Sequence, residues 1–250
     1  MKIAKFIYKR NVLWGKVENS FLIPLKEEPY KSIKLTAEKI PLKKCRLLAP
    51  ADPSKIILTG LNYKDHAQEL NMKIPQEPVI FLKPPTALTG PNTVIIYPKT
   101  VQRLDYEAEL AIVIRKKAKN IKAKDAHKYI LGYTCLNDIT ARDLQSKDIQ
   151  WSRAKSFDTF CPLGPWLITK LSSLDLKIQL YLNGKLKQNS STKSFIFSLE
   201  YLIAFISSIM TLLPGDIIST GTPPGVGKMR KGDIVEVKIQ GIGCLKNHII

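Results

Sequence analysis

The sequence predicts a mainly β protein with a few packed helices, of the α+β class. Apolar runs at residues 55–60 and 110–114 have the length and composition of strands buried inside a sheet. Residues 178–182 alternate apolar and polar side chains and lead directly into Asn183-Gly184, a dipeptide that favours a tight hairpin turn. Segments with helical character are few and short by comparison, so strands are expected to form most of the fold.

The N-terminal residues 1–48 are predicted to form a small strand-rich region. Their apolar stretches are too short for helices of ordinary length and are interrupted by prolines such as Pro24 and Pro41. Residues 48–53 contain two further prolines, which stop any helix and stiffen the chain. We therefore place a boundary there and assign residues 49–250 to a second, larger domain.

Two segments of the larger domain are predicted to be helical. Residues 125–129 form one short turn, and residues 199–212 carry apolar side chains along one face, as an amphipathic helix does. Pro214 and Gly215 follow the second segment and end it. Residues 234–239 then form a further β-rich segment.

The chain is strongly basic, with 39 lysines and arginines against 21 aspartates and glutamates and a net charge of +18. Such a charge invites a nucleic-acid partner, but the lysines are spread over predicted loops and strand ends. No helix-turn-helix, zinc-finger or aromatic RNA-binding pattern accompanies them. We therefore expect a solvated basic surface that attracts small anions, and keep a basic binding protein as the alternative from a different class.

The sequence is also typical of a cytoplasmic protein without a membrane partner. Its first residues are charged, and the longest apolar run, residues 199–213, is shorter than the roughly 20 residues of a membrane helix. The four cysteines are scattered and form no CxxC pair, which indicates reduced thiols.

Glu107 and Glu109 are predicted to point from one face of a strand, because side chains at i and i+2 of a strand share a face. Two adjacent carboxylates repel each other, and a cation between them relieves the repulsion. All-oxygen ligation suits magnesium, manganese or calcium. Taken alone, however, the pattern is better explained as an exposed strand face that carries two glutamates.

Asp138 supplies a possible third carboxylate. It precedes Arg142 and Gln145, which lie one turn apart if this segment is helical. An arginine beside a glutamine is well suited to bind a carboxylate or an oxo group. The alternative is a polar helix start with Asp138 as its cap.

His66 and Glu69 are three residues apart, so on a helical turn the glutamate can hydrogen-bond the imidazole and orient it as a base. A surface contact is the alternative. Zinc is not indicated, because the other two histidines, His127 and His248, are far away in the sequence.

Two further segments offer groups that could bind an anion. Residues 151–165 are dense in aromatics, prolines and glycines, and are predicted to form an ordered loop that presents Lys155 to an enolate or oxyanion. A solvated lysine is the alternative. The glycine-rich residues 213–227 fit neither phosphate-binding pattern, but allow a small ligand to approach the backbone closely, with Thr222 as a donor.

Taken in order, these segments resemble the fumarylacetoacetate hydrolase family, in its short bacterial branch of acylpyruvases and 2-hydroxyhepta-2,4-diene-1,7-dioate isomerases. The resemblance extends from Ile56 to the C-terminus and rests on NYxxHxxE, DYExEL, NDxTARDxQ, KSFDTFCPxGP and PGDxxxTGTPxGVG. One departure is Arg115, where similar proteins usually have a glycine after the ExE strand.

The resemblance implies a mixed β-roll or β-sandwich of this family's C-terminal type, a homodimer, and a small anionic oxo-acid as the substrate. It also implies a bound Mg²⁺ or Mn²⁺, with Ca²⁺ able to take the site in crystals. The site residues that it implies are the metal ligands Glu107, Glu109 and Asp138; the catalytic residues His66, Glu69 and Lys155; and the substrate contacts Arg142, Gln145 and Thr222.

The activity implied by the resemblance is metal-dependent hydrolysis of a C–C bond in a small 2,4-dioxo acid, such as fumarylpyruvate or acetylpyruvate, through an enolate. The alternative is an isomerase or decarboxylase. It would act on 2-hydroxyhepta-2,4-diene-1,7-dioate, on 5-carboxymethyl-2-hydroxymuconate-type diacids or on oxaloacetate. The motifs leave this choice open, because all these reactions share the enolate.

Overall fold

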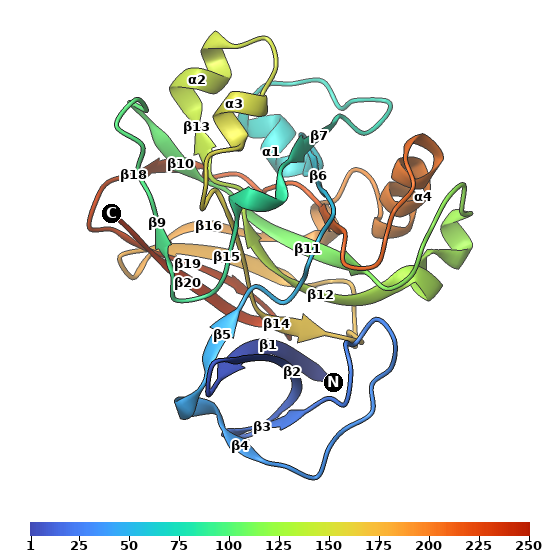
Figure 1. Ribbon diagram of the computed structural model, residues 1–250. Helices are drawn as coiled ribbons and strands as arrows, with labels where there is room; N and C mark the ends of the chain where they lie inside the picture. Colours follow the sequence, from blue (N-terminus) through green and yellow to red (C-terminus); the bar gives the residue numbers. More distant parts are fainter.

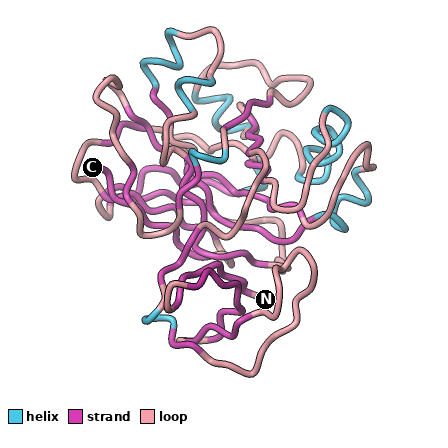
Figure 2. Tube along the Cα trace, viewed as in Figure 1, coloured by secondary structure: helices cyan, strands magenta, loops and turns pink.

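The computed structural model describes residues 1–250 and is built mainly from strands, with helices around their periphery (Figures 1 and 2). The predicted fold class, mainly β with a few helices, is thereby confirmed. The largest sheet has 12 strands. Its main path is β4 (Ile40–Pro41), β3 (Phe21–Pro24), β2 (Asn11–Glu18), β1 (Lys2–Tyr8), β14 (Cys161–Ile168), β12 (Ile130–Asn137), β11 (Ala108–Ile114), β17 (Ile217–Ser219), β6 (Ile56–Thr59) and β7 (Ile80–Lys83). Off this path, β5 (Arg46–Leu48) pairs with β1, and β8 (Leu88–Thr89) pairs with β14.

Two smaller sheets complete the β structure. One has five strands in the order β16 (Lys185–Ser191), β15 (Lys177–Leu182), β19 (Ile234–Ile239), β20 (Gly243–Ile249) and β9 (Val94–Ile95). The other has three, in the order β13 (Thr140–Ala141), β10 (Leu104–Tyr106) and β18 (Gly227–Met229). The predicted hairpin joins β15 to β16, and Asn183 and Gly184 adopt φ angles of 51° and 75° there.

The N-terminal strands form a curled group at one end of the molecule, away from α1, α2 and α3 (Figure 1). They enclose a small core of their own, formed by Ala4, Phe6, Leu22 and Ile40. Strand β1 nevertheless pairs with β14 as well as with β2, so the large sheet continues from this region into the rest of the chain. The division after residue 48 stays a prediction.

The helices are short. They are α1 (Lys64–Glu69), α2 (Arg142–Lys147), α3 (Ser152–Lys155) and α4 (Leu199–Ile209), with 3-10 helices η1 (Leu42–Lys44), η2 (Pro85–Ala87), η3 (Ala123–Tyr129) and η4 (Thr192–Ser194). The turn expected at residues 125–129 is therefore part of a 3-10 helix. Helix α4 begins after Ser198, whose hydroxyl accepts from the backbone of Tyr201. It ends earlier than predicted, at Ile209, because Leu212 instead forms a β-bridge with Ala118.

Strand β11 lies in the middle of the large sheet, between β12 and β17, and every one of its residues is buried. Both faces of this strand are covered, which explains why its sequence is a continuous apolar run rather than an alternating one. Its first residues carry the functional groups described below. None of the helices is long and apolar enough to cross a membrane.

Candidate metal centre and active site

Glu107, Glu109 and Asp138 form a buried cluster of carboxylates. One ligand atom from each lies within 4.8 Å of the other two, and the three residues are 1–7% exposed. Glu109 belongs to β11, and Glu107 immediately precedes that strand. Asp138 follows β12, the neighbour of β11, and its backbone N–H donates to the Glu107 carbonyl at 2.8 Å. The adjacent strands therefore bring together residues that are about thirty positions apart.

The ExE segment was predicted to be one continuous strand, and this is wrong at Glu107. The structure breaks the segment into β10 and β11 at that residue. Two buried side-chain amides accept from the backbone there: Asn137 Oδ1 from the N–H of Glu107, and Gln188 Oε1 from the N–H of Ala108, both at 2.9 Å. The carboxylates of Glu107 and Glu109 still converge, although not as neighbours on one regular strand face.

Asp138 is not the cap of a helix. Helix α2 begins at Arg142, and its N-cap residue is Ala141. Asp138 instead lies in the connection between β12 and β13, where two lysines approach its carboxylate. Lys83 Nζ is 2.5 Å from Oδ1, and Lys155 Nζ is 2.5 Å from Oδ2.

Three cationic side chains surround the carboxylate cluster. Lys155 also donates to Glu107 Oε2 at 3.0 Å and to the hydroxyl of Thr140 at 2.7 Å. It lies in the last turn of α3 and is 2% exposed, so it is neither solvated nor part of the loop predicted at residues 151–165. Arg142 pairs with Glu107 and with the buried carboxylate of Asp105, and its guanidinium donates to Gln145 Oε1 at 2.5 Å.

These charges shift the pKa values of the cluster in opposite directions. Burial disfavours the charged form of Glu107, but the positive charges of Lys155 and Arg142 outweigh it and lower the pKa of Glu107 to about 2. Burial, reinforced by the charge of Asp138, raises the pKa of Glu109 well above its usual value. Burial opposes the charge of Lys155, yet Asp138 and Glu107 raise its pKa overall. Without a bound cation, Glu107 is therefore held charged by its cationic partners, whereas burial and Asp138 favour the neutral form of Glu109.

The residues of the cluster fit a divalent cation. The donor set consists only of carboxylate oxygens, which hard cations such as Mg²⁺ and Mn²⁺ prefer. Burial and a neighbouring carboxylate disfavour ionisation of Glu109, and a cation held between the three groups would remove that penalty. Ser219 and the N–H of Gly221 both donate to Glu109 Oε2, which directs this carboxylate by two hydrogen bonds.

His66 and Glu69 form the predicted pair. His66 Nδ1 is 2.8 Å from Glu69 Oε2, and both residues lie on α1. The N–H of Gly225 donates to the other oxygen of Glu69 at 3.0 Å, so the loop after β17 orients this carboxylate. His66 is 8% exposed, and its second ring nitrogen is left for the cavity that the histidine lines.

A cavity of about 370 Å³ brings most of the predicted site residues together. Glu109 and Glu69 do not line it but adjoin it, through the carboxylate cluster and through the bond to His66. The predicted residues that line the cavity are His66, Glu107, Asp138, Arg142, Gln145, Lys155 and Thr222. Their roles stay predictions.

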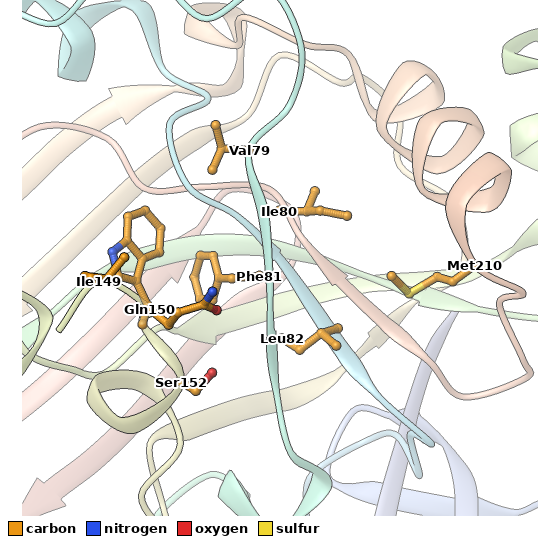
Figure 3. Close-up of a pocket in the computed structure, with 9 residues that line it drawn as sticks. Val79, Ile80, Phe81, Leu82, Ile149, Gln150, Ser152 and Met210 are labelled. Atoms are coloured by element: carbon orange, nitrogen blue, oxygen red, sulfur yellow. The ribbon is translucent and has the colours of Figure 1, made fainter.

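A second cavity, of about 530 Å³, lies beside the first, and Val79, Phe81 and Trp151 border both. Its walls are mostly apolar: Val79, Ile80, Phe81 and Leu82 lie along the β7 segment, and Met210 lies at the end of α4 (Figure 3). No ionisable side chain lines it. The residues for which the sequence predicts acid–base roles therefore lie in or beside the first cavity only.

Sequence reasoning missed several residues that hold the site. Lys83 is 1% exposed and donates to the carbonyls of Ile139 and Phe160, in addition to its contact with Asp138. Its position directly after the apolar run of residues 79–82 was a usable signal, because a lysine that becomes buried needs a charged partner. Asn137 and Gln188 carried no such signal, since ordinary polar residues of strands have the same appearance in the sequence.

The fold and the buried carboxylates define a metal-dependent enzyme. Residues 55–250 match the fumarylacetoacetate (FAA) hydrolase C-terminal family, and residues 1–50 match the Rv2993c-like N-terminal family. The chain therefore belongs to the fumarylacetoacetate hydrolase family, as its motifs suggested. Within that family it has the Rv2993c-like arrangement of the two parts.

Named relatives of the chain include isomerases and a tautomerase. It is 45% identical to the mitochondrial oxaloacetate tautomerase Fahd2a of Rattus norvegicus, over 84% of this chain and 71% of that protein. It is 41% identical, with a TM-score of 0.95, to a 5-carboxymethyl-2-hydroxymuconate delta-isomerase from Mycobacterium smegmatis, which covers 100% of this chain and 99% of that one. It is 40% identical, with a TM-score of 0.93, to a 2-hydroxyhepta-2,4-diene-1,7-dioate isomerase from Mycobacterium marinum, and this match covers 100% of this chain and 98% of that one.

Proposed function

We propose that this protein is a metal-dependent isomerase of small 2-oxo diacids, which interconverts keto and enol forms or moves a double bond. The observation that carries the proposal is the content of one cavity. It combines the carboxylate cluster, two cationic side chains and a histidine that is oriented by a glutamate. A reaction through an enolate needs a base and cationic groups that stabilise the enolate, and the carboxylate cluster could hold a divalent cation that would act as the electrophile.

Each of the protein's own groups has a step to perform. Arg142 and Lys155 line the cavity and bind the carboxylate and the developing enolate oxygen of the substrate. The His66 ring nitrogen that does not face Glu69 accepts the proton from the carbon next to the 2-oxo group, and Glu69 stabilises the resulting imidazolium. The same nitrogen returns the proton to oxygen or to a more distant carbon. A divalent cation, when bound, supplies Lewis acidity to the 2-oxo group.

The names of the relatives support isomerisation over hydrolysis. Fahd2a is named as an oxaloacetate tautomerase, and the two mycobacterial structures are named as isomerases of unsaturated acids with two or three carboxylates. The compounds in these names are small 2-oxo or 2-hydroxy acids with two or three carboxylates. A cavity of about 370 Å³ lined by Arg142 and Lys155 suits anionic compounds of that size. A binding protein without activity is disfavoured, because ionisable groups with shifted pKa values that gather beside an oriented histidine in one cavity are typical of catalytic sites.

The test is a substrate panel, run with Mg²⁺, with Mn²⁺ and with EDTA. It contains oxaloacetate, 5-carboxymethyl-2-hydroxymuconate and 2-hydroxyhepta-2,4-diene-1,7-dioate. Ultraviolet absorbance follows the enol or diene, and proton NMR in D₂O identifies the products. We expect metal-dependent conversion that keeps all carbon atoms in one molecule, faster than in a blank with the same metal and no protein. Conversion that is indifferent to EDTA, or absent for the whole panel, contradicts the proposal.

Hydrolysis of an acylpyruvate is the second candidate. It is favoured by the 2.8 Å contact between His66 and Glu69, because such a pair can also deprotonate a water molecule for attack on a carbonyl carbon. Acetylpyruvate and fumarylpyruvate in the same panel separate the two reactions. Hydrolysis releases pyruvate and a second acid, isomerisation releases neither, and decarboxylation of oxaloacetate releases pyruvate and carbon dioxide.

We also propose that the protein acts as a homodimer, in line with the family resemblance. Apolar side chains such as Val79, Leu82 and Ile149 are 50%, 48% and 98% exposed around the edge strand β7, and a second copy would cover surface of this kind. Light scattering on the purified protein gives the mass directly. A mass of one chain, 28.2 kDa, at micromolar concentration contradicts this part of the proposal.

A further inference from the structure

Gln188 is a fully buried amide that joins two parts of the site. It lies on β16 and has an exposed fraction of 0%. Its Oε1 accepts from the backbone N–H of Ala108, between the two glutamates of the carboxylate cluster, at 2.9 Å. Its Nε2 donates to the carbonyl of Pro223 at 2.7 Å and to the hydroxyl of Thr222 at 2.9 Å. Every hydrogen-bonding direction but one of this side chain is thus used inside the protein.

The backbone partners determine the orientation of this amide. The N–H of Ala108 can only donate, so it must face the oxygen of Gln188. The carbonyl of Pro223 can only accept, so it must face the nitrogen. The second proton of Nε2 is therefore donated to Thr222 Oγ1, and the Thr222 hydroxyl acts as an acceptor on that side.

A hydroxyl that accepts from Gln188 must direct its own proton elsewhere. The structure contains no protein acceptor for the proton of Thr222 Oγ1, and Thr222 lines the 370 Å³ cavity while being 3% exposed. The cavity is also where Arg142 and Lys155 present their positive charges. An anionic ligand oxygen in the cavity would accept this proton in a charge-assisted hydrogen bond.

We infer that Gln188 is a positioning residue that turns the Thr222 hydroxyl into a hydrogen-bond donor for an anionic oxygen of the substrate. The inference rests on the proposed function in one respect, that the cavity takes a small oxo-acid anion. Its consequence is selectivity for acceptors. An oxygen anion gains a hydrogen bond from Thr222. A ligand with a hydrogen-bond donor at that point is disfavoured, because the Thr222 proton points at it and cannot rotate toward Gln188.

Strand β16 is suited to this task because it anchors both sides of the site. Ser190, two residues after Gln188 and hence on the same face of the strand, donates to Asp65 Oδ2 at 2.5 Å. Asp65 belongs to α1, which carries His66. The same strand face therefore contacts both the helix of the histidine and the loop of Thr222.

Two substitutions separate the two hydrogen-bonding roles of Gln188. Gln188→Glu keeps an acceptor for the N–H of Ala108 but places a second oxygen, in place of a donor, against both the Thr222 hydroxyl and the Pro223 carbonyl. The Thr222 hydroxyl then donates to the new glutamate and presents only lone pairs to the cavity. Gln188→Leu removes both roles and leaves the N–H of Ala108 without a partner. Gln179→Glu is the matched control, because Gln179 lies on the paired strand β15 and its amide only donates to Asn189 at the surface.

The experiment measures the affinity of the Mg²⁺-loaded proteins for 2-oxoglutarate and for oxalate by calorimetry, alongside KM and kcat for any panel substrate. We expect Gln188→Glu to weaken anion binding roughly tenfold or more, with Mg²⁺ affinity not weakened. Gln188→Leu should weaken both anion and Mg²⁺ binding. Gln179→Glu should behave as the wild type.

Thr222→Val provides the decisive comparison, because it removes the hydroxyl and keeps the shape of the side chain. If Gln188 acts through Thr222, the double variant Gln188→Glu/Thr222→Val binds the anions within about twofold of Thr222→Val alone. If Gln188→Glu does not fold, the same cycle is run with Gln188→Leu. If the losses of anion affinity in the two single variants multiply in the double variant, the inference is overturned. It is also overturned if Gln188→Glu binds the anions as tightly as the wild type does.

The two proposals fail in distinguishable ways. If the wild-type protein binds 2-oxoglutarate or oxalate but converts no panel substrate, the proposed function is contradicted. The anion affinities of the Gln188 and Thr222 variants then still test the role of Gln188. A wild-type cavity that binds neither anion overturns the role of Gln188 as well.

Discussion

Lys83 and Lys155 approach the same carboxylate, each from one of its two oxygen atoms. Both ammonium groups are 2.5 Å from Asp138, and both lysines are almost completely buried. Only Lys155 lines the cavity, so the two lysines cannot have the same task. Lys155 is placed to meet a substrate, whereas Lys83 ties Asp138 to the chain segments at residues 139 and 160.

Replacing Lys83 by methionine should lower the free energy of unfolding by about 3 kcal/mol, because it leaves one oxygen of a buried carboxylate without its counter-charge. Urea unfolding of the metal-free protein measures the change. Lys231→Met, at an exposed turn position, should change stability by no more than about 0.5 kcal/mol. Equal stabilities of the two variants would show that Lys83 is not needed to hold Asp138.

His66→Ala tests the assignment of the base. We expect kcat to fall by roughly 10²- to 10⁴-fold, because the group that moves the proton is lost. Mg²⁺ affinity should remain near that of the wild type, since His66 is not part of the carboxylate cluster. Kinetics on the converted substrate and calorimetry with Mg²⁺ measure the two quantities. Normal turnover by His66→Ala would show that a residue other than His66 moves the proton.

At the scale of elements, the sequence predicts best where a pattern is long. Strand β11, the β15–β16 hairpin and most of α4 follow from apolar runs, a turn dipeptide and helical periodicity. Helices α1, α2 and α3 have six, six and four residues, which is too few for a periodic pattern, although each of them carries at least one predicted site residue. The break at Glu107 was unpredictable for another reason: it depends on amides of Asn137 and Gln188, which reach it only through the fold.

The loop after β17 should be sensitive to a single methyl group at Gly225. This residue has a φ of 93°, and a Cβ there would lie 2.3 Å from the carbonyl oxygen of Lys187. Gly225→Ala must therefore shift the loop and weaken its hydrogen bond to Glu69. We expect at least a tenfold loss of kcat and a lower melting temperature, measured by steady-state kinetics and differential scanning fluorimetry.

Gly232→Ala is the matched control for that substitution. Gly232 has a φ of 90°, and its Cβ would meet nothing within 4 Å. It should share the conformational strain, about 1 kcal/mol, without the steric clash, and its kcat should equal that of the wild type. Similar losses of kcat in both variants would mean that strain alone, rather than displacement of the loop, lowers activity.

At the scale of the whole molecule, the site depends on the complete fold. Its residues come from α1, the start of β11, the β12–β13 connection, α2, α3 and the loop after β17, which the fold brings together. The order of these residues in the chain could be matched to a family, but their convergence could not be calculated from spacing. Spacing alone favoured an exposed pair at Glu107 and Glu109, whereas the fold buries both beside Asp138.

Because strands distant in the sequence supply the carboxylate cluster, a cation bound there should stabilise the whole fold. At a free Mg²⁺ concentration about 100 times its Kd, the expected gain is about 2.7 kcal/mol, which corresponds to a rise in Tm of roughly 5–10 °C for a chain of this size. Differential scanning calorimetry in EDTA and in Mg²⁺, at matched ionic strength, measures it. Glu109→Gln is the control: burial already raises the pKa of Glu109 and favours its neutral form without metal, so the amide should fold normally but lose the response to Mg²⁺. A rise in Tm that survives Glu109→Gln would place the cation elsewhere on the protein.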